Sequence, residues 1–123
     1  MFEICAFDHV NVSIPKEEGS TSTARAFYFD FLKLREIEKP VEMKNRTGFW
    51  CACGDLQLHV SLEDFAYRSH TKAHFAIRIK NMDDFIKKSK DFGVALQAAE
   101  SLKARRFHMR DPFGNRIELI ETF

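Results

Sequence analysis

Two histidines occupy equivalent positions early in the two halves of the chain, and an oxygen-bearing side chain follows late in each half. His9 begins the segment HVNV, and His74 begins the similar segment HFAI. Gln57 lies in GDLQLHV, and Glu118 lies in the similar segment GNRIELI. Two imidazoles, an amide oxygen and a carboxylate suit a divalent metal ion such as zinc, nickel, cobalt, manganese or iron. Such an ion would act as a Lewis acid toward a carbonyl or enediolate oxygen.

The run from Arg105 to Glu121 predicts a strand, a tight turn and a returning strand. Pro112 presets one turn angle, and Gly114 tolerates positive φ. The returning strand places Glu118 among isoleucine and leucine residues, where burying a carboxylate without a partner is costly. A metal ion would be such a partner. Matching this run to GDLQLHV aligns Glu118 with Gln57, with one extra residue in the second copy.

Strand alternation predicts which side chains share a cleft with these four residues. Successive side chains of a strand point to opposite faces, so every second residue lies on one face. Apolar residues such as Val10 and Phe75 should pack against the helices, which leaves a polar face on each half. If the two polar faces close on each other, the cleft holds His9, Asn11, Gln57, His59, His74, Arg78, Arg106, His108 and Glu118.

The roles of the histidines near the ligands stay open at this point. His59 lies on the same face as Gln57 and could replace it as a ligand, or act as an acid or base. His108 is the other candidate for proton transfer. The structural alternatives are a glutamine hydrogen-bonded inside the cleft and histidines hydrogen-bonded in the core.

Arg78 and Arg106 are candidate substrate-binding residues, together with Asn11. A guanidinium on the cleft could bind a carboxylate or phosphate of an anionic small molecule. The alternative is that both arginines are solvated surface residues.

Both halves show the same order of predicted elements. Strands are predicted at 5–14, 34–41, 47–53 and 56–62 with a helix at 24–32, and at 73–79, 94–98, 105–110 and 115–120 with a helix at 82–92. The polar linker 63–72 separates a first module, about 3–62, from a second, about 73–122. A half this short cannot bury both faces of its sheet, so we predict a single domain, 1–123. The predicted fold class is α+β, with two tandem βαβββ modules forming an open, curved mixed sheet around a metal-binding cleft.

The composition fits one globular domain and excludes several classes of protein. The chain has 123 residues, 45% of them hydrophobic, which allows a substantial core. Lys and Arg number 19 against 18 Asp and Glu, so the basic field that nucleic-acid binding needs is lacking. No apolar run reaches the length of a membrane span, and no signal-peptide pattern is present. The 3 cysteines do not form a disulfide framework, so we expect a cytoplasmic location.

Several motifs resemble the vicinal oxygen chelate superfamily, which includes glyoxalase I, methylmalonyl-CoA epimerase, fosfomycin- and bleomycin-resistance proteins and extradiol dioxygenases. These motifs, which cover nearly the whole chain, are FDHVNVSIP, ARAFYFDFLKL, GDLQLHV, KAHFAIRI and RRFHMRDPFGNRIELIE. The resemblance implies metal ligands at His9, Gln57, His74 and Glu118, and a homodimer. Gln at the second position is similar to the epimerase branch, whereas glyoxalase I more often has an acid there.

The resemblance also implies a glyoxalase-like enzyme that binds one divalent metal ion and acts on a small carbonyl or 2-oxo compound. The chemistry would be that of a lyase or isomerase with a metal-stabilised enediolate, and Glu118 would be both ligand and proton shuttle. One alternative is an Fe(II) dioxygenase, in which two histidines and a carboxylate form a facial triad. Another is a non-catalytic drug-binding protein similar to the bleomycin-resistance members. The substrate, the metal, the choice between Gln57 and His59, and the pairing of modules within or between subunits stay open.

Overall fold

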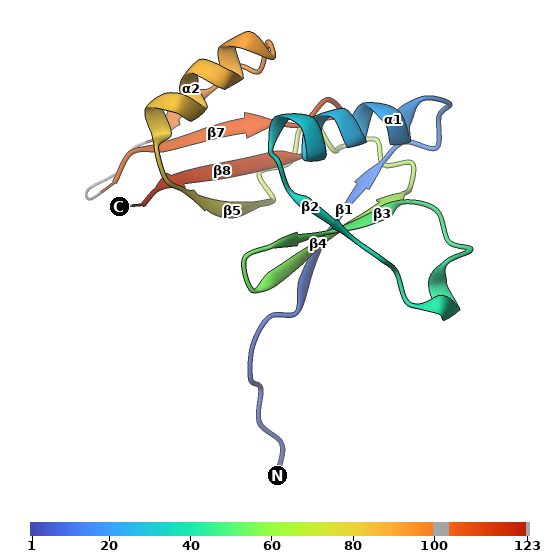
Figure 1. The fold of residues 1–123 in the computed structure, drawn as a ribbon. Coiled ribbons are helices and arrows are strands. Elements are labelled where there is room, and N and C mark those ends of the chain that lie inside the picture. Colours follow the sequence, from blue (N-terminus) through green and yellow to red (C-terminus); the bar gives the residue numbers. More distant parts are fainter. Residues whose placement is uncertain (100–103, 123) are drawn as a thin grey trace.

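Each half of the chain forms its own four-stranded sheet and its own helix (Figure 1). The computed structural model describes residues 1–99 and 104–122. The first half contains β1 (His9–Ile14), α1 (Ser20–Arg25), η1 (Ala26–Phe31), β2 (Arg35–Ile37), η2 (Val41–Met43), β3 (Phe49–Cys53) and β4 (Leu56–Leu62). The second half contains β5 (His74–Ile79), α2 (Met82–Asp91), β6 (Gln97–Ala99), β7 (Arg106–Arg110) and β8 (Arg116–Glu121).

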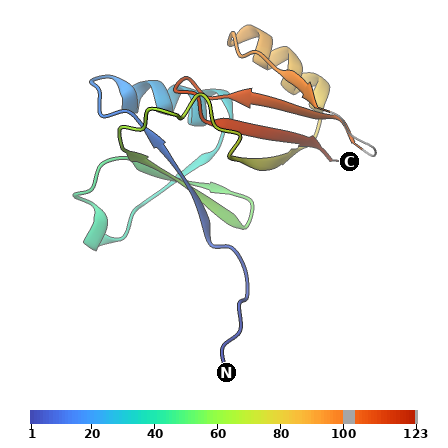
Figure 2. The same cartoon turned by 180° about the vertical axis from the view of Figure 1, so that it is seen from behind.

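The two sheets have the same strand order. The first runs β1-β4-β3-β2, and the second runs β5-β8-β7-β6. In each sheet the first and last strands of the module are parallel neighbours, and the other pairs are antiparallel. Figures 1 and 2 show α2 along one side of the second sheet, next to β7 and β8. The predicted α+β fold with two βαβββ modules is confirmed.

The first strand starts later than predicted, because its partner strand limits the pairing. Pairing with β4 begins at His9, which lies opposite Gln57. One further hydrogen bond, from the Gln57 backbone N–H to the Asp8 carbonyl at 3.3 Å, precedes it. The chain before Asp8 has no regular structure and extends away from the body in both views (Figure 2). Three large apolar side chains in this arm are 85%, 85% and 86% exposed: Phe2, Ile4 and Phe7.

The first helix begins earlier than predicted and ends in a wider, π-helical segment. We predicted a helix over 24–32, whereas α1 begins at Ser20 and continues as η1. The Leu32 N–H donates to the Phe27 carbonyl, five residues back, at 2.9 Å. The wider turn buries Phe27, Tyr28 and Phe31 together, although two of them are consecutive.

Other strands are shorter than predicted for local reasons. The strand predicted over 34–41 is limited to β2, since Pro40 has no N–H to donate and η2 follows it. The strand predicted over 94–98 is β6, because the Val94 N–H donates to the Ser89 carbonyl at the end of α2 instead. Gly48 precedes β3 with φ of 88°, and a Cβ there would collide with the Val60 carbonyl of β4.

Ring packing and a hydrogen bond connect the two modules. Phe31 of the first module packs against Phe85 and Phe92 of the second, with ring centroids 5.4 Å and 5.1 Å apart. Asn115 Nδ2 donates to the Ser13 carbonyl at 2.8 Å. No helix among the described residues is long and apolar enough to cross a membrane.

A buried carboxylate in the second module anchors this interface. Asp111 is 4% exposed and accepts hydrogen bonds from the Tyr28 hydroxyl at 2.7 Å and from the backbone N–H groups of Phe113 and Asn115. Asn115 Nδ2 donates to it as well, at 2.8 Å. Burial raises the pKa of Tyr28 well above its usual value, and the negative charge of Asp111 is the second cause of this rise. The phenol therefore stays a neutral donor.

The substitution Asp111→Asn is therefore expected to lower the free energy of unfolding by about 2–3 kcal/mol. The amide NH₂ of asparagine replaces one carboxylate oxygen, so hydrogen-bond donors around residue 111 would face another donor and lose their acceptor. Urea denaturation followed by circular dichroism measures the change. The matched control is Asp91→Asn at the exposed end of α2, which should change the value by less than about 0.5 kcal/mol. Equal effects of the two substitutions would contradict the assigned role of Asp111.

Candidate metal centre and cleft

Two histidines and a carboxylate meet on the second sheet. His74, His108 and Glu118 each offer one ligand atom, and these atoms lie within 4.8 Å of one another. Strand pairing produces the cluster, because Glu118 lies directly opposite both His108 and Ala76, and His74 shares a face with Ala76. His108 Nε2 is 3.5 Å from Glu118 Oε1. In residues 1–99 and 104–122, this is the one such group of histidine, cysteine, aspartate or glutamate side chains.

The histidines of this cluster are suited to metal binding. Burial, followed by the charge of Arg116, lowers the pKa of His108, which favours the neutral ring near pH 7. The Nδ1 atom of His74 is hydrogen-bonded to the Lys72 carbonyl at 2.8 Å. That bond makes Nδ1 the donor and leaves Nε2 of His74 as a possible ligand atom. The cluster carries one formal negative charge, on Glu118, with Arg106 Nη1 3.5 Å from it.

The face that bears the cluster is open and basic. α2 lies on the other side of the sheet (Figure 1), and His74, Ala76 and Arg78 are exposed. Arg78 and Arg106 lie on this face, as strand alternation predicted. Glu118 is the only acid among the described strand residues on this face. These residues are His74, Ala76, Arg78, Gln97, Ala99, Arg106, His108, Arg110, Arg116, Glu118 and Ile120.

Three aromatic rings stack on the first sheet. The Trp50 and His59 rings are 3.8 Å apart and nearly parallel, and the His59 and His9 rings are 4.0 Å apart. Gln57 Oε1 is hydrogen-bonded to His59 Nε2 at 2.8 Å, and Asp8 Oδ2 to His9 Nδ1 at 2.8 Å. Burial, with a smaller contribution from His9, lowers the pKa of His59, so a neutral ring is favoured.

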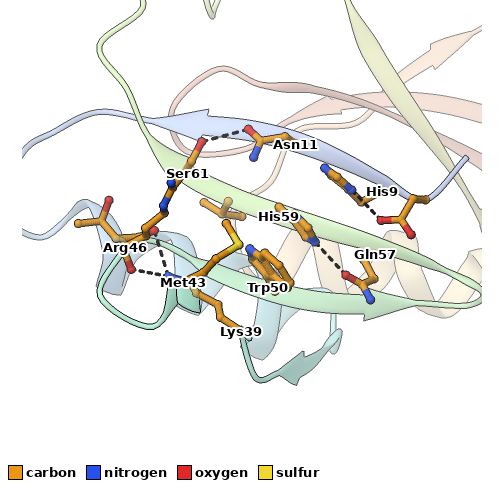
Figure 3. A pocket seen from close by; sticks show the side chains of 12 residues that line it. His9, Asn11, Lys39, Met43, Arg46, Trp50, Gln57, His59 and Ser61 are labelled. Carbon is orange, nitrogen blue, oxygen red and sulfur yellow. Dashed lines mark hydrogen bonds and ion pairs between the residues drawn. The ribbon is translucent and has the colours of Figure 1, made fainter. Parts of the chain in front are cut away.

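These rings line a pocket of about 610 Å³ (Figure 3). The predicted residue Asn11 lies in it and accepts a hydrogen bond from the Ser61 hydroxyl at 3.0 Å. Lys39 and Trp50 also line it, and neither is among the candidate site residues predicted from the sequence. Alternation in the strand 47–53 could have indicated Trp50, because it lies opposite His59. Lys39 follows the end of β2, and no periodic pattern predicts its position.

Strand register shows which residues of the two modules correspond. His9 lies opposite Gln57, and His74, the counterpart of His9, lies opposite Arg116. Gln57 therefore corresponds to Arg116 and not to Glu118. By this register the extra residue of the second copy lies in the turn before β8, 111–115, which is longer than the turn before β4, 54–55. The role of Gln57 as the first-module counterpart of Glu118 in metal binding stays a prediction.

The residue of the first module that corresponds to Glu118 is His59. Asn11 lies opposite His59, just as Ala76 lies opposite Glu118. Register therefore aligns His59 with Glu118, and the choice between Gln57 and His59 as the metal ligand stays a prediction. In the described structure Gln57 is the hydrogen-bond partner of His59.

The predicted site residues lie in two groups, one on each sheet. No hydrogen bond, ion pair or ring contact joins these groups in the part of the chain that the structure describes. A single ion bound by all four predicted ligands stays a prediction. The first group is His9, Asn11, Gln57 and His59, and the second is His74, Arg78, Arg106, His108 and Glu118.

The two cysteines of β3, Cys51 and Cys53, are not activated as nucleophiles. Burial, followed by the nearby Glu36 charge, raises the pKa of the Cys51 thiol to about 12. Burial raises the pKa of Cys53 as well. A thiol with a raised pKa is a poor nucleophile near neutral pH. Cys5, Cys51 and Cys53 are all free, and the cytoplasmic location stays a prediction.

Solved structures provide similar folds over the whole chain. A protein from Bacillus anthracis described as belonging to the glyoxalase family is 34% identical, with a TM-score of 0.86, and the alignment covers 100% of this chain and 99% of that one. The fosfomycin resistance protein FosX from Listeria monocytogenes is 16% identical, with a TM-score of 0.76 and coverage of 98% and 96%. Lactoylglutathione lyase from Agrobacterium tumefaciens is 17% identical, with a TM-score of 0.70 and coverage of 94% and 92%. No protein-family model and no curated protein sequence matches the chain.

Proposed function

This chain belongs to the glyoxalase family of the vicinal oxygen chelate superfamily, and from this premise we propose that it is a divalent-metal-dependent enzyme acting on a small carbonyl or 2-oxo compound. The observation that carries the proposal is the cluster of His74, His108 and Glu118 on an open sheet face. Lyase or isomerase chemistry fits best, because a carboxylate and a neutral imidazole stand beside each other there.

The donor chemistry of the cluster fits zinc, nickel, cobalt, manganese or iron. In this proposal His74 and Glu118 bind the ion, and His9 and Gln57 complete the site, with His59 as the alternative to Gln57. When bound, the metal supplies Lewis-acid stabilisation of negative charge on a substrate oxygen. The single carboxylate leaves the site with net positive charge, which suits that role.

Proton transfer is assigned to Glu118 and His108. A carboxylate oxygen of Glu118 can take the proton next to the substrate carbonyl, and His108 Nε2, 3.5 Å from the other oxygen, can accept or return a proton. Arg106 beside Glu118 is placed to hold an anionic substrate group. Asn11 and Arg78 are the further substrate-binding candidates, one on each sheet.

A second copy of the chain supplies the other half of the site in this proposal. The face bearing His74 is exposed. In the described part of the chain no hydrogen bond, ion pair or ring contact joins His74 to His9 or His59, although Asn11 and His74 line one pocket. The apolar side chains of the arm 1–8 are also exposed, and a partner could cover them. These features support a homodimer in which each cleft combines the first sheet of one copy with the second sheet of the other.

The direct test is metal titration of the purified, chelator-treated chain by isothermal calorimetry, followed by assays on 2-oxo compounds and hemithioacetals. We expect one ion bound per chain, and turnover that requires it. Absence of binding by all five candidate metals would contradict the proposal and would leave drug binding without catalysis as the remaining reading.

An Fe(II) dioxygenase is the second candidate, because two histidines and one carboxylate are the composition of a facial triad. The metal requirement and the need for oxygen distinguish the dioxygenase from the glyoxalase-type activity. Oxygen consumption on catechols that needs iron supports the dioxygenase. Oxygen-independent turnover with zinc, nickel or cobalt supports the glyoxalase type.

A further inference from the structure

A second pocket adjoins the His74–His108–Glu118 cluster, and its charged lining is basic. It has a volume of about 540 Å³, and His108 belongs to both the pocket and the cluster. Its other charged or titratable lining residues are His70, Lys72, Arg110 and Arg116. No aspartate or glutamate is among its described lining residues.

Strand pairing brings these cations together. Arg110 is the last residue of β7 and lies directly opposite Arg116, the first residue of β8. Arg116 also lies opposite His74, two residues after Lys72. Like charges directly opposite each other on a sheet are destabilising, so this arrangement has a cost unless another group compensates for it.

Backbone carbonyls provide only partial compensation. Arg110 donates to the Gly114 carbonyl at 2.7 Å and to the Thr71 carbonyl at 3.2 Å, and Arg116 makes a long contact of 3.5 Å with the Lys72 carbonyl. Among the described residues, neither guanidinium pairs with a carboxylate. Nor does the Lys72 side chain form a hydrogen bond or an ion pair there. A bound anion would neutralise these charges more fully than carbonyl dipoles do.

We infer that this basic pocket binds the phosphoryl group of a phosphorylated 2-oxo substrate whose carbonyl reaches the adjacent metal cluster. The inference deepens the proposed function and rests on it. Cations from the linker, β7 and β8 suit a dianion with three exposed oxygens, whereas a carboxylate offers one charge and two oxygens. Because His108 lines both spaces, the phosphoryl group would bind next to the reacting carbonyl.

The test uses inorganic phosphate as the probe, titrated into the intact 123-residue chain at low ionic strength and followed by calorimetry or NMR. Lys72→Ala is the informative variant, since only the backbone carbonyl of this residue has a structural contact in the described chain. We expect phosphate affinity to fall roughly tenfold. The matched control, Lys87→Ala on the exposed side of α2, should leave it unchanged. Acetate should bind at least about tenfold more weakly than phosphate.

Three results would overturn the inference: no phosphate binding, equal phosphate affinity in Lys72→Ala and wild type, or acetate binding as tight as phosphate. Divalent-metal titration of the same variants keeps the two proposals apart. Normal metal binding with failed phosphate binding overturns the phosphoryl pocket alone. Normal phosphate binding with failed metal binding supports the anion pocket and overturns the metal-dependent activity.

Discussion

The substitution Glu118→Gln is expected to reduce divalent-metal affinity at least about 100-fold, or about 2.8 kcal/mol, and to abolish turnover. Glutamine keeps the size of the side chain but removes the only acidic charge among the described strand residues of the open face. Without it, the positive charge of the ion is no longer offset, and the basic neighbour Arg106 repels it. Calorimetric titration measures the affinity, and thermal unfolding with and without metal gives an independent value.

The matched control for this prediction lies on the same strand. Glu121→Gln removes a carboxylate whose partner is Arg105, on the other face of β8. Metal affinity and turnover should stay at the wild-type value in this variant. If Glu118→Gln also kept them, the cluster would not be the metal site, and the proposed chemistry would fail with it.

Period-2 patterns predicted the faces of the strands well, because alternation is a local property of an extended chain. Arg78 and Arg106 lie on the predicted face for this reason, and Met109 lies on the opposite, buried one. Asp111 falls between the predicted strands 105–110 and 115–120, and the sequence does not show that Tyr28, 83 residues earlier, will donate to it. Such a contact depends on how the modules pack.

Strand register could not be predicted from the same patterns. Gln57 and His59 lie on one face and satisfy alternation equally well, so only the pairing with β1 separates them. The lengths of the turns before β4 and β8 set that pairing, and they differ between the modules. The meeting of the two sheet faces is less predictable still, since it depends on contacts between modules or between copies.

The proposal of a shared site leads to a prediction with an all-or-none result. A homodimer of the His9→Ala variant and a homodimer of the His74→Ala variant should each lose tight metal binding, because every site then lacks one histidine. Co-expression of the two variants with different tags gives a heterodimer that can be isolated. If each site combines the first sheet of one copy with the second sheet of the other, one heterodimer site contains both defects and the other contains none.

This heterodimer is therefore expected to bind one metal ion per dimer and to recover about half of the wild-type turnover per dimer. Elemental analysis and the 2-oxo assay measure the two quantities. Both histidines are exposed in the single chain, so neither substitution removes a core contact, and circular dichroism checks that the variants fold. A heterodimer without metal would mean that the modules of one chain close on each other, because each cleft would then keep its own defect. Failure to capture any heterodimer through the two tags would contradict the dimer itself.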